Sequence, residues 1–263
     1  MRFLALGAGV QSTAVLMLAL RGDLPPLDAA IFADTGHEPA AVYAHLERMR
    51  ARCVAAGLDL EVVTGGDIRD FSRPAGTGSG IDAPFYTVTP DGDRGIIPRQ
   101  CTRALKIRPM RRAIRRRMAA TGATTATQVF GISADEYQRM RDSDVRYLTN
   151  EYPLVDLRWT RNDCRTYLAD LGIDAPRSAC IGCPFHSDNE WRSMRDDRPD
   201  EWREAIAWES DAQAAFEATP RLRAIPYVHR SRVPLADVDL STPEDHGQLS
   251  LGFGDECGGV CGV

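Results

Sequence analysis

Short apolar runs alternate with amphipathic segments over the first third of the chain. Three apolar runs have the length of buried strands: RFLALGAG, DAAIFADTG and LDLEVVTGG. Gly22 and Gly57 follow the amphipathic segments between them, at positions where helices commonly end. Strands that alternate with helices predict a parallel α/β sheet with helices on both faces.

The pattern changes after residue 65. Residues 65–99 are rich in Gly, Pro and Asp, so we expect a long loop there, with a small hairpin at PFYTVTPDGDRGIIP. A helix is expected over about residues 102–121, and a fourth strand is expected within TATQVFGISADE.

Helical patterns continue toward the C-terminus. We expect a helix capped by Thr160 or Asn162, followed by a longer helical segment with a break near Pro199. The chain is therefore divided into an α/β domain, residues 1–175, and a C-terminal segment, residues 176–263. This segment is helical and irregular, and we expect its glycine-rich terminal tail to be mobile.

Composition is that of an ordinary soluble globular protein, with 263 residues, 43% of them hydrophobic and 26% charged. No apolar run reaches about 18 residues, so we expect no membrane span. The apolar start resembles a signal peptide, but Gly7, Gly9 and the polar residues at 11–13 interrupt it. We therefore expect a cytoplasmic protein.

Basic residues are concentrated in one segment. The chain carries a net charge of −5, yet Arg99–Arg117 contains nine basic residues and no acidic one. This concentration favours a local anionic ligand rather than general affinity for nucleic acid. A solvated helix face explains it equally well, because Met110, Ile114 and Met118 would lie on one side and leave the arginines on the other.

A glycine-rich turn joins the first expected strand to the first expected helix, and it consists of Gly7, Ala8, Gly9, Val10, Gln11, Ser12 and Thr13. Glycines let the backbone approach a ligand, and a helix N-terminus offers N–H groups and a positive dipole end. The hydroxyls of Ser12 and Thr13 can add donors, so the turn suits pyrophosphate. Taken alone, such a turn is often only a turn.

Asp34 is expected at the carboxyl end of the second strand, where open α/β sheets bind ligands. Its carboxylate can accept from an adenine amino group or a ribose hydroxyl, or help to hold Mg²⁺. The alternative is that Asp34 or Thr35 caps the next helix.

Cysteine spacing suggests a metal or redox site. Cys180 and Cys183 form a C-x-x-C pair, with Cys101 far upstream, and the pair is compatible with zinc, thioredoxin-type redox chemistry or an iron–sulfur cluster. Pro184 directly after the pair favours a cluster. His186 is a further ligand candidate, although a hydrogen-bonded histidine is the commoner case.

Two other cysteines, Cys53 and Cys164, fall within expected helices at positions that look buried, and we interpret both as core residues. The last two, Cys257 and Cys261, belong to the terminal tail. The total of seven is odd, and without a secretory signal a disulfide scaffold is not expected.

Five motifs occur in one order: GAGVQST, ADTGHEP, CTRALKIRP, GISADEYQR and CIGCPFH. In this combination the chain resembles the adenine nucleotide alpha-hydrolase superfamily, in the branch of phosphoadenosine phosphosulfate (PAPS) reductases and ATP pyrophosphatases. The resemblance covers roughly residues 1–215. It implies a Rossmann-like PP-loop domain whose glycine-rich turn binds the phosphates of ATP, with Asp34 near the nucleotide.

The resemblance also implies a metal centre and a substrate loop. Cys101, Cys180 and Cys183 match the positions that hold a [4Fe–4S] cluster in the family, and the segment from Gly131 to Arg141 matches a substrate-contacting loop. Lys106, the only lysine of the chain, falls in the family's cysteine–lysine motif. A compact ammonium there can approach cluster sulfurs and an anionic substrate, which a planar guanidinium cannot do in the same volume.

The chain departs from the family pattern in two places. Reductases of adenosine phosphosulfate (APS) carry paired cysteines where this chain has Gln100 and Cys101, so the fourth cluster position is an open iron, Cys257 or Cys261. The tail DECGGVCGV resembles the reductase tail whose cysteine attacks sulfonyl sulfur, and Cys257 would be that residue. Cys261 is not part of the reductase pattern.

Three functions follow from these features. The preferred one is an ATP pyrophosphatase-type sulfur-transfer enzyme, with Mg²⁺, a [4Fe–4S] cluster, and Lys106 and Arg103 stabilising charge. It would adenylate an acceptor for thiolation or phosphorothioation. The second is a PAPS or APS reductase with Cys257 as its nucleophile. The third is a non-catalytic nucleotide-binding module with structural zinc.

The preferred function implies particular partners. These are ATP, an anionic acceptor such as a nucleic acid or a nucleotide-like metabolite, and a sulfur donor such as a cysteine desulfurase. No membrane partner is expected, and a homodimer is one assembly left open.

Overall fold

The computed structural model describes residues 1–72, 83–219, 223–241, 245 and 247. These residues form two compact units: the first contains residues 1–65 and 102–178, and the second contains residues 66–101 and the described residues from 179 onward. The tail cysteines Cys257 and Cys261 lie outside the described residues.

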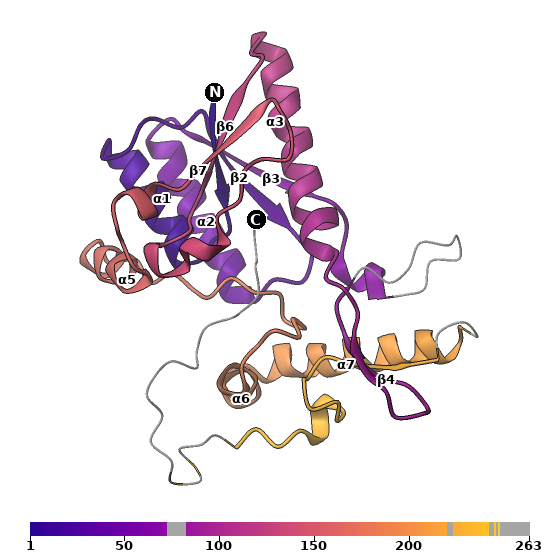
Figure 1. The fold of residues 1–263 in the computed structure, drawn as a ribbon. Coiled ribbons are helices and arrows are strands. Elements are labelled where there is room, and N and C mark those ends of the chain that lie inside the picture. The colour runs from indigo at the N-terminus through magenta and orange to yellow at the C-terminus, as the bar shows by residue number, and fades with distance from the viewer. Residues whose placement is uncertain (73–82, 220–222, 242–244, 246, 248–263) are drawn as a thin grey trace. The chain divides into compact units, whose positions relative to one another are not determined.

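A five-stranded parallel sheet forms the centre of the first unit, with strand order β3-β2-β1-β6-β7 (Figure 1). The strands are β1 (Arg2–Leu6), β2 (Ala29–Asp34), β3 (Asp59–Thr64), β6 (Ala126–Phe130) and β7 (Leu148–Glu151). The first four lie within the predicted segments. The strand β7 was not predicted, because its sequence LTNE is short and polar.

Helices cover both faces of this sheet, as predicted (Figure 1). The helical elements are α1 (Val10–Arg21), α2 (Ala40–Ala55), the π-helix η2 (Thr102–Ile107), α3 (Arg108–Thr121), the 3₁₀ segment η3 (Ala134–Arg139), α4 (Pro153–Asp156) and α5 (Arg161–Asp170). Side chains of α1, α2 and α5 pack on one face, and α3 packs on the other. Thr160 caps α5 through a capping box, one of the two predicted caps.

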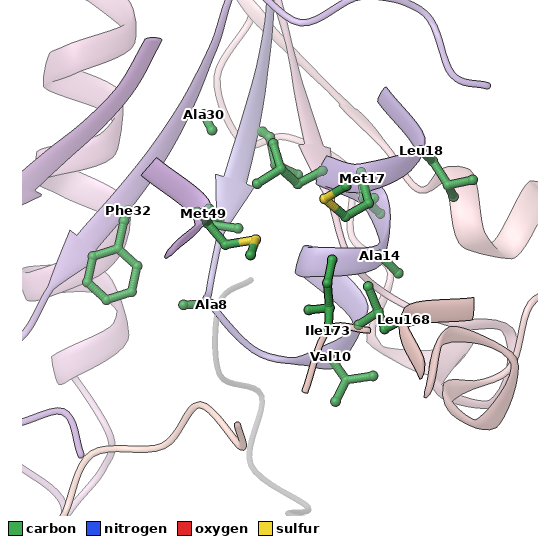
Figure 2. Close-up of a cluster of buried hydrophobic side chains, with 14 of the residues drawn as sticks. Ala8, Val10, Ala14, Met17, Leu18, Ala30, Phe32, Met49, Leu168 and Ile173 are labelled. Atoms are coloured by element: carbon green, nitrogen blue, oxygen red, sulfur yellow. The ribbon is translucent and has the colours of Figure 1, made fainter. Parts of the chain in front are cut away.

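Alternate residues of the central strand β1 contribute side chains to the hydrophobic clusters on the two faces of the sheet. Leu4 and Leu6 of β1 join the cluster under α1 and α2, whereas Phe3 joins the cluster under α3. Figure 2 shows the first cluster, in which Ala8 and Val10 lie among the buried side chains. The turn after β1 is therefore anchored in the hydrophobic core through Ala8 and Val10.

Ion pairs of α3 account for part of the basic segment. Its buried side consists of Met110, Ile114 and Met118, as predicted. On the outer side, Arg117 pairs with Asp59 and Glu61 of the edge strand β3, and Arg111 pairs with Asp144. These arginines thus neutralise acidic residues of the same unit, and the helix-face interpretation accounts for them without a ligand.

The second unit contains an antiparallel sheet of order β5-β4-β8. Its elements are η1 (Ile68–Ser72), β4 (Tyr86–Val88), β5 (Arg94–Ile96), α6 (Asp188–Asp197), α7 (Pro199–Glu217), β8 (Ile225–Tyr227) and η4 (Leu235–Asp237). The strands β4 and β5 form the predicted hairpin, and Pro199 begins a new helix at the predicted break.

The observed units differ from the predicted division in two respects, because residues 176–178 belong to the first unit and residues 66–101 to the second. Residues 66–101 were assigned to the N-terminal domain, but they belong to the second unit, because β4 pairs with β8. A contact between strands more than 130 residues apart leaves no local signal in the sequence. Among the described residues, no helix has both the length and the apolar character needed to cross a membrane.

Candidate nucleotide site and cysteine turn

The glycine-rich turn occupies the point in the sheet where the strand order reverses. β1 pairs with β2 on one side and with β6 on the other. The chain runs from β1 through α1 to β2, and only after β3 does it cross to β6. In open α/β sheets, ligands bind at such a reversal, beside the carboxyl ends of the strands.

The first turn of α1 begins without a side-chain cap. Gly9 is the N-cap residue, and no side chain accepts a hydrogen bond from the first turn of the helix there. Ala8 has a left-handed backbone with a φ of 55°, which is uncommon for a residue other than glycine. Ala8 and Val10 are buried as whole residues, whereas Gly7 is exposed and Gly9 and Gln11 are partly exposed, so a ligand at this turn would meet these three residues.

Hydroxyl groups hold the turn in its shape. Ser12 Oγ accepts from the backbone N–H of Gly7 at 3.2 Å and donates to the carbonyl of Gly9 at 3.2 Å. Ser178, at the end of the first unit, donates to the carbonyl of Gly7. A Cβ on Gly9 would lie 3.2 Å from Ser178 Cβ, so the chain at 178 packs closely on the turn.

Gly131, directly after β6, lies against the first turn of α1. A Cβ at Gly131 would lie 2.5 Å from the backbone nitrogen of Ser12 and 2.6 Å from its Cα. Real Cβ atoms do not approach other atoms this closely, so glycine is required at this position. The loop after β6 is thus held against the helix that carries the glycine-rich turn.

A polar network connects the same two elements. Gln11 Nε2 donates to Glu136 Oε2 at 3.0 Å and lies 3.4 Å from Ser133 Oγ. Glu136 also accepts from Arg139 Nη1 at 2.8 Å. Gln11 was predicted as a site residue, but Ser133, Glu136 and Arg139 were not singled out within the loop.

Thr13 points into the protein rather than to a ligand. Its side chain is fully buried, and Thr13 Oγ1 lies 2.9 Å from Nε2 of the equally buried His45 on α2. Its backbone N–H bonds to the carbonyl of Gly9 at 3.0 Å. The expectation that the Thr13 hydroxyl donates to phosphate does not agree with this arrangement.

His45 is held in its neutral form. Burial, followed by the charge of Arg48, lowers the pKa of His45 from 6.5 to about 4. A neutral imidazole under the first turn of α1 therefore links α1 to α2 through Thr13 at physiological pH.

Asp34 is used within its own loop. Its Oδ1 accepts from the backbone N–H of Gly36 at 2.8 Å and from the Tyr43 hydroxyl at 2.9 Å. Burial and the neighbouring Asp34 carboxylate raise the pKa of Tyr43, so Tyr43 stays a hydrogen-bond donor. Asp34 thus stabilises the turn after β2. It is partly exposed and lies at the carboxyl end of β2, as predicted.

The single lysine pairs with a buried glutamate of the loop after β2. Lys106, in the π-helix, has its Nζ 3.5 Å from Glu38 Oε1. The Glu38 side chain is only 1% exposed, and its Oε1 also accepts from Thr35 Oγ1 at 3.0 Å. A buried carboxylate needs a cation nearby, so Lys106 has a structural partner in the first unit. Arg103, in the same π-helix, is exposed.

The C-x-x-C pair forms a compact turn in the second unit, named here the cysteine turn (Cys180–Cys183). The backbone N–H of Cys183 donates to the carbonyl of Cys180 at 3.0 Å. His186 Nε2 donates to the carbonyls of Cys180 and Ile181 at 2.9 and 3.2 Å. The imidazole therefore supports the backbone of the turn, which agrees with the hydrogen-bonded alternative for His186.

Cys101 lies in the same unit as the cysteine turn. Two residues before it, the guanidinium of Arg99 lies over the Phe185 ring, 5.4 Å from its centroid. However, within the described residues no three His, Cys, Asp or Glu side chains are grouped so that they could hold a metal ion. The thiols thus suit soft metals such as iron, but the described residues do not present them as an assembled metal site.

The remaining described cysteines are core residues, as predicted. Cys53 and Cys164 are fully buried. Burial raises the pKa of Cys53 to about 11 and that of Cys164 to about 12, so neither thiol is a nucleophile at neutral pH.

The sequence analysis did not single out several residues that lie around the glycine-rich turn and the loop after β2. Ser178 and His45 are separated in the chain from the groups that they contact, as Glu38 is from Lys106, and polar residues of these types are common on surfaces. The motifs ADTGHEP and GISADEYQR contained Glu38 and Glu136, so the motifs marked the loops but not which side chain would be buried.

The fold and the turn together define an α/β domain of the nucleotide-binding class, in which an uncapped helix N-terminus lies where the strand order reverses. Residues 2–176 match the family model of the phosphoadenosine phosphosulfate reductase domain. The match covers more than half of the chain, so the chain belongs to this family of nucleotide-utilising enzymes. A comparison with curated proteins gives no match.

Proposed function

We propose that the chain is an ATP-dependent enzyme that releases pyrophosphate and transfers sulfur to an anionic acceptor. The observation that carries this proposal is the N-terminus of α1, which has no side-chain cap and lies at the reversal of strand order. Gly131 holds the loop after β6 against the same helix turn. Fixed N–H groups of this kind suit the phosphates of a nucleotide bound with Mg²⁺.

The proposed reaction has two substitutions. An acceptor oxygen attacks the α-phosphorus of ATP, the bond to the bridging oxygen breaks, and pyrophosphate leaves while the acceptor proton passes to solvent. Hydrosulfide then displaces AMP and forms the thiolated acceptor. If the donor is instead the persulfide of a cysteine desulfurase, its outer sulfur displaces AMP, and a second thiol then cleaves the resulting disulfide and is itself oxidised to a disulfide with the donor cysteine. The glycine-rich turn would hold the phosphates, and Arg103 and Lys106 would stabilise the charge that develops.

Cys101, Cys180 and Cys183 are the residues that we propose to hold a [4Fe–4S] cluster. Their thiol chemistry and their place in one unit support this. Among the described residues, however, the three thiols are not grouped as metal ligands, so the site would form only when the cluster binds. When bound, such a cluster can carry the sulfide that is transferred. Cys257, Cys261 or an open iron would complete it.

One alternative is a PAPS reductase, the activity for which the matched family model is named. In that case Cys257, which lies beyond the matched residues 2–176, would be the nucleophile. The two functions differ in their products. The full chain, purified without oxygen, is to be incubated with ATP–Mg²⁺ and candidate acceptors, and separately with PAPS and reduced thioredoxin. Pyrophosphate and AMP from the first reaction support sulfur transfer, whereas sulfite from the second supports the reductase.

Metal content tests the cluster separately. Iron with absorbance near about 400 nm supports a cluster, and zinc alone supports the third hypothesis, a structural zinc module. Cys180→Ser should lose the metal, whereas Cys53→Ala, which changes a core thiol of the first unit, should keep it. A metal-free wild-type protein, or equal loss in both variants, would exclude these three cysteines as ligands.

A further inference from the structure

We propose that Glu136 is a positioning residue that fixes Gln11 and Arg139 for the anionic ligand of the glycine-rich turn. The inference rests on the proposed function, because it assumes that a nucleotide binds at this turn. Neither the family match nor the motif that contains Glu136 assigns this role.

Burial and hydrogen bonding single out this carboxylate. Glu136 is 7% exposed, and one oxygen, Oε2, accepts from both Gln11 Nε2 at 3.0 Å and Arg139 Nη1 at 2.8 Å. Gln11 also lies 3.4 Å from the hydroxyl of Ser133, which is fully buried. A buried carboxylate is costly unless such partners neutralise it, so the network has a specific reason to persist.

The position of the network connects it to the ligand site. Gln11 belongs to the first turn of α1, whose N–H groups face the proposed phosphates, and Glu136 follows β6 by six residues. Between them, Gly131 lies in backbone contact with Ser12. The carboxylate therefore bridges the two segments that meet at the reversal of strand order.

Charge explains why a glutamate would be used here. A carboxylate close to a polyphosphate is repulsive unless a cation offsets it, and Arg139 provides that cation. In return, the carboxylate restricts the guanidinium of Arg139, whose side chain is 18% exposed. A guanidinium that is already fixed loses less entropy when it meets an anionic ligand.

Glu136→Gln keeps the size of the side chain and can keep a hydrogen bond to Gln11, but it removes the charge. We expect about tenfold weaker binding of ATP–Mg²⁺ by titration calorimetry, as for the loss of a charge-assisted hydrogen bond. The double variant Gln11→Glu/Glu136→Gln restores an amide–carboxylate pair but moves the charge away from Arg139. It should bind ATP no better than the single variant, and recovery to the wild-type affinity would overturn the assignment.

Glu201→Gln is the matched control. Glu201 pairs with Arg198 at 2.8 Å with the same three-residue spacing and nearly the same burial, but in the second unit. Both variants should lose a similar amount of stability, and only Glu136→Gln should weaken nucleotide binding. Equal effects of the two variants on affinity, or no effect of either, would show that Glu136 serves stability alone.

A second readout needs no ligand. In the ligand-free protein, Arg139 should react several-fold faster with phenylglyoxal in Glu136→Gln than in the wild type, as followed by peptide mass spectrometry. An unchanged rate would overturn the restraint on Arg139. If the wild type binds PAPS instead of ATP, the same affinity comparisons apply with PAPS, and only the proposed sulfur-transfer function fails. If the wild type binds neither nucleotide, the proposed function and the role of Glu136 both fail.

Discussion

The glycine-rich turn and the cysteine turn are both irregular segments that carry chemistry, but they are held in different ways. The glycine-rich turn is fixed by backbone contact with Gly131, which leaves no room for a Cβ beside Ser12, and by the hydroxyls of Ser12 and Ser178. The cysteine turn is fixed by side chains: the ring of Trp208 packs directly on Gly182, and His186 bonds to two carbonyls.

This difference separates a site that is fixed in advance from one that can adjust. Backbone atoms of a helix and a strand end cannot move without disturbing the sheet, so the N–H groups of the first site keep their geometry before a ligand arrives. Side chains that support a turn can rotate. Such a support is compatible with thiols that come together only when an inorganic centre binds.

The largest effect on stability is expected for Gly131→Ala, which tests whether backbone contact fixes the glycine-rich turn. The new Cβ would overlap the Ser12 backbone, so we expect the free energy of unfolding to fall by about 3 kcal/mol, the upper part of the range for overpacking. Denaturant unfolding measures this. Gly7→Ala is the control, because its Cβ would meet only Ser12 Oγ and Ser178 Oγ, at 3.7 and 3.8 Å. Equal stability of the two variants would refute the role of backbone contact.

Gly182→Ala tests the cysteine turn in the same way. Its Cβ would lie 1.9 Å from Trp208 Cε3, and the Phe85 ring packs against this tryptophan at a centroid distance of 4.9 Å. We expect a loss of about 2 kcal/mol, less than at Gly131, because a ring can shift where a backbone cannot. The control is Gly95→Ala, whose Cβ would approach only Thr87 Oγ1, at 2.9 Å, a hydroxyl that can rotate away more easily than a buried indole ring can shift. A larger loss at Gly182 than at Gly131 would reverse the comparison.

These contacts also mark how far sequence reasoning could reach. The strand, glycine turn and helix were predictable because each depends on residues adjacent in the chain. The contact of Gly131 with Ser12 joins residues more than 100 positions apart, and glycine alone does not say what lies beside it. The same holds for residues 66–101, whose strand β4 pairs with β8 and not with a strand of the parallel sheet that precedes them in the sequence.

Protonation of His45 tests the glycine-rich turn by a chemical route. The pKa of this buried imidazole is lowered from 6.5 to about 4, so the unfolded chain binds a proton between these values while the folded protein does not. The stability that depends on neutral His45 is complete above pH 6.5 and is lost as the pH falls. Between pH 6.5 and 5 we expect a loss of about 2 kcal/mol.

The measurement is denaturant unfolding of the wild type and of His45→Gln across this pH range. The variant lacks the titrating group but can still reach Thr13, so its pH dependence should be flatter by most of the expected amount. Parallel curves for the two proteins would mean that other groups cause the acid sensitivity.

The smallest effect is expected at His186, which supports the cysteine turn. His186→Leu removes the donor to the carbonyls of Cys180 and Ile181, and we expect a loss of about 1 kcal/mol, the usual net value of a hydrogen bond. His186→Gln keeps an N–H group and should lose less than half of this.

Because the imidazole holds the turn, the half-buried thiol of Cys183 should also react faster with iodoacetamide in His186→Leu, by several-fold. If stability falls but the rate at Cys183 is unchanged, the imidazole supports the second unit in general and not the cysteine turn. The contrast with the glycine-rich turn would then rest on Gly182 and Trp208 alone.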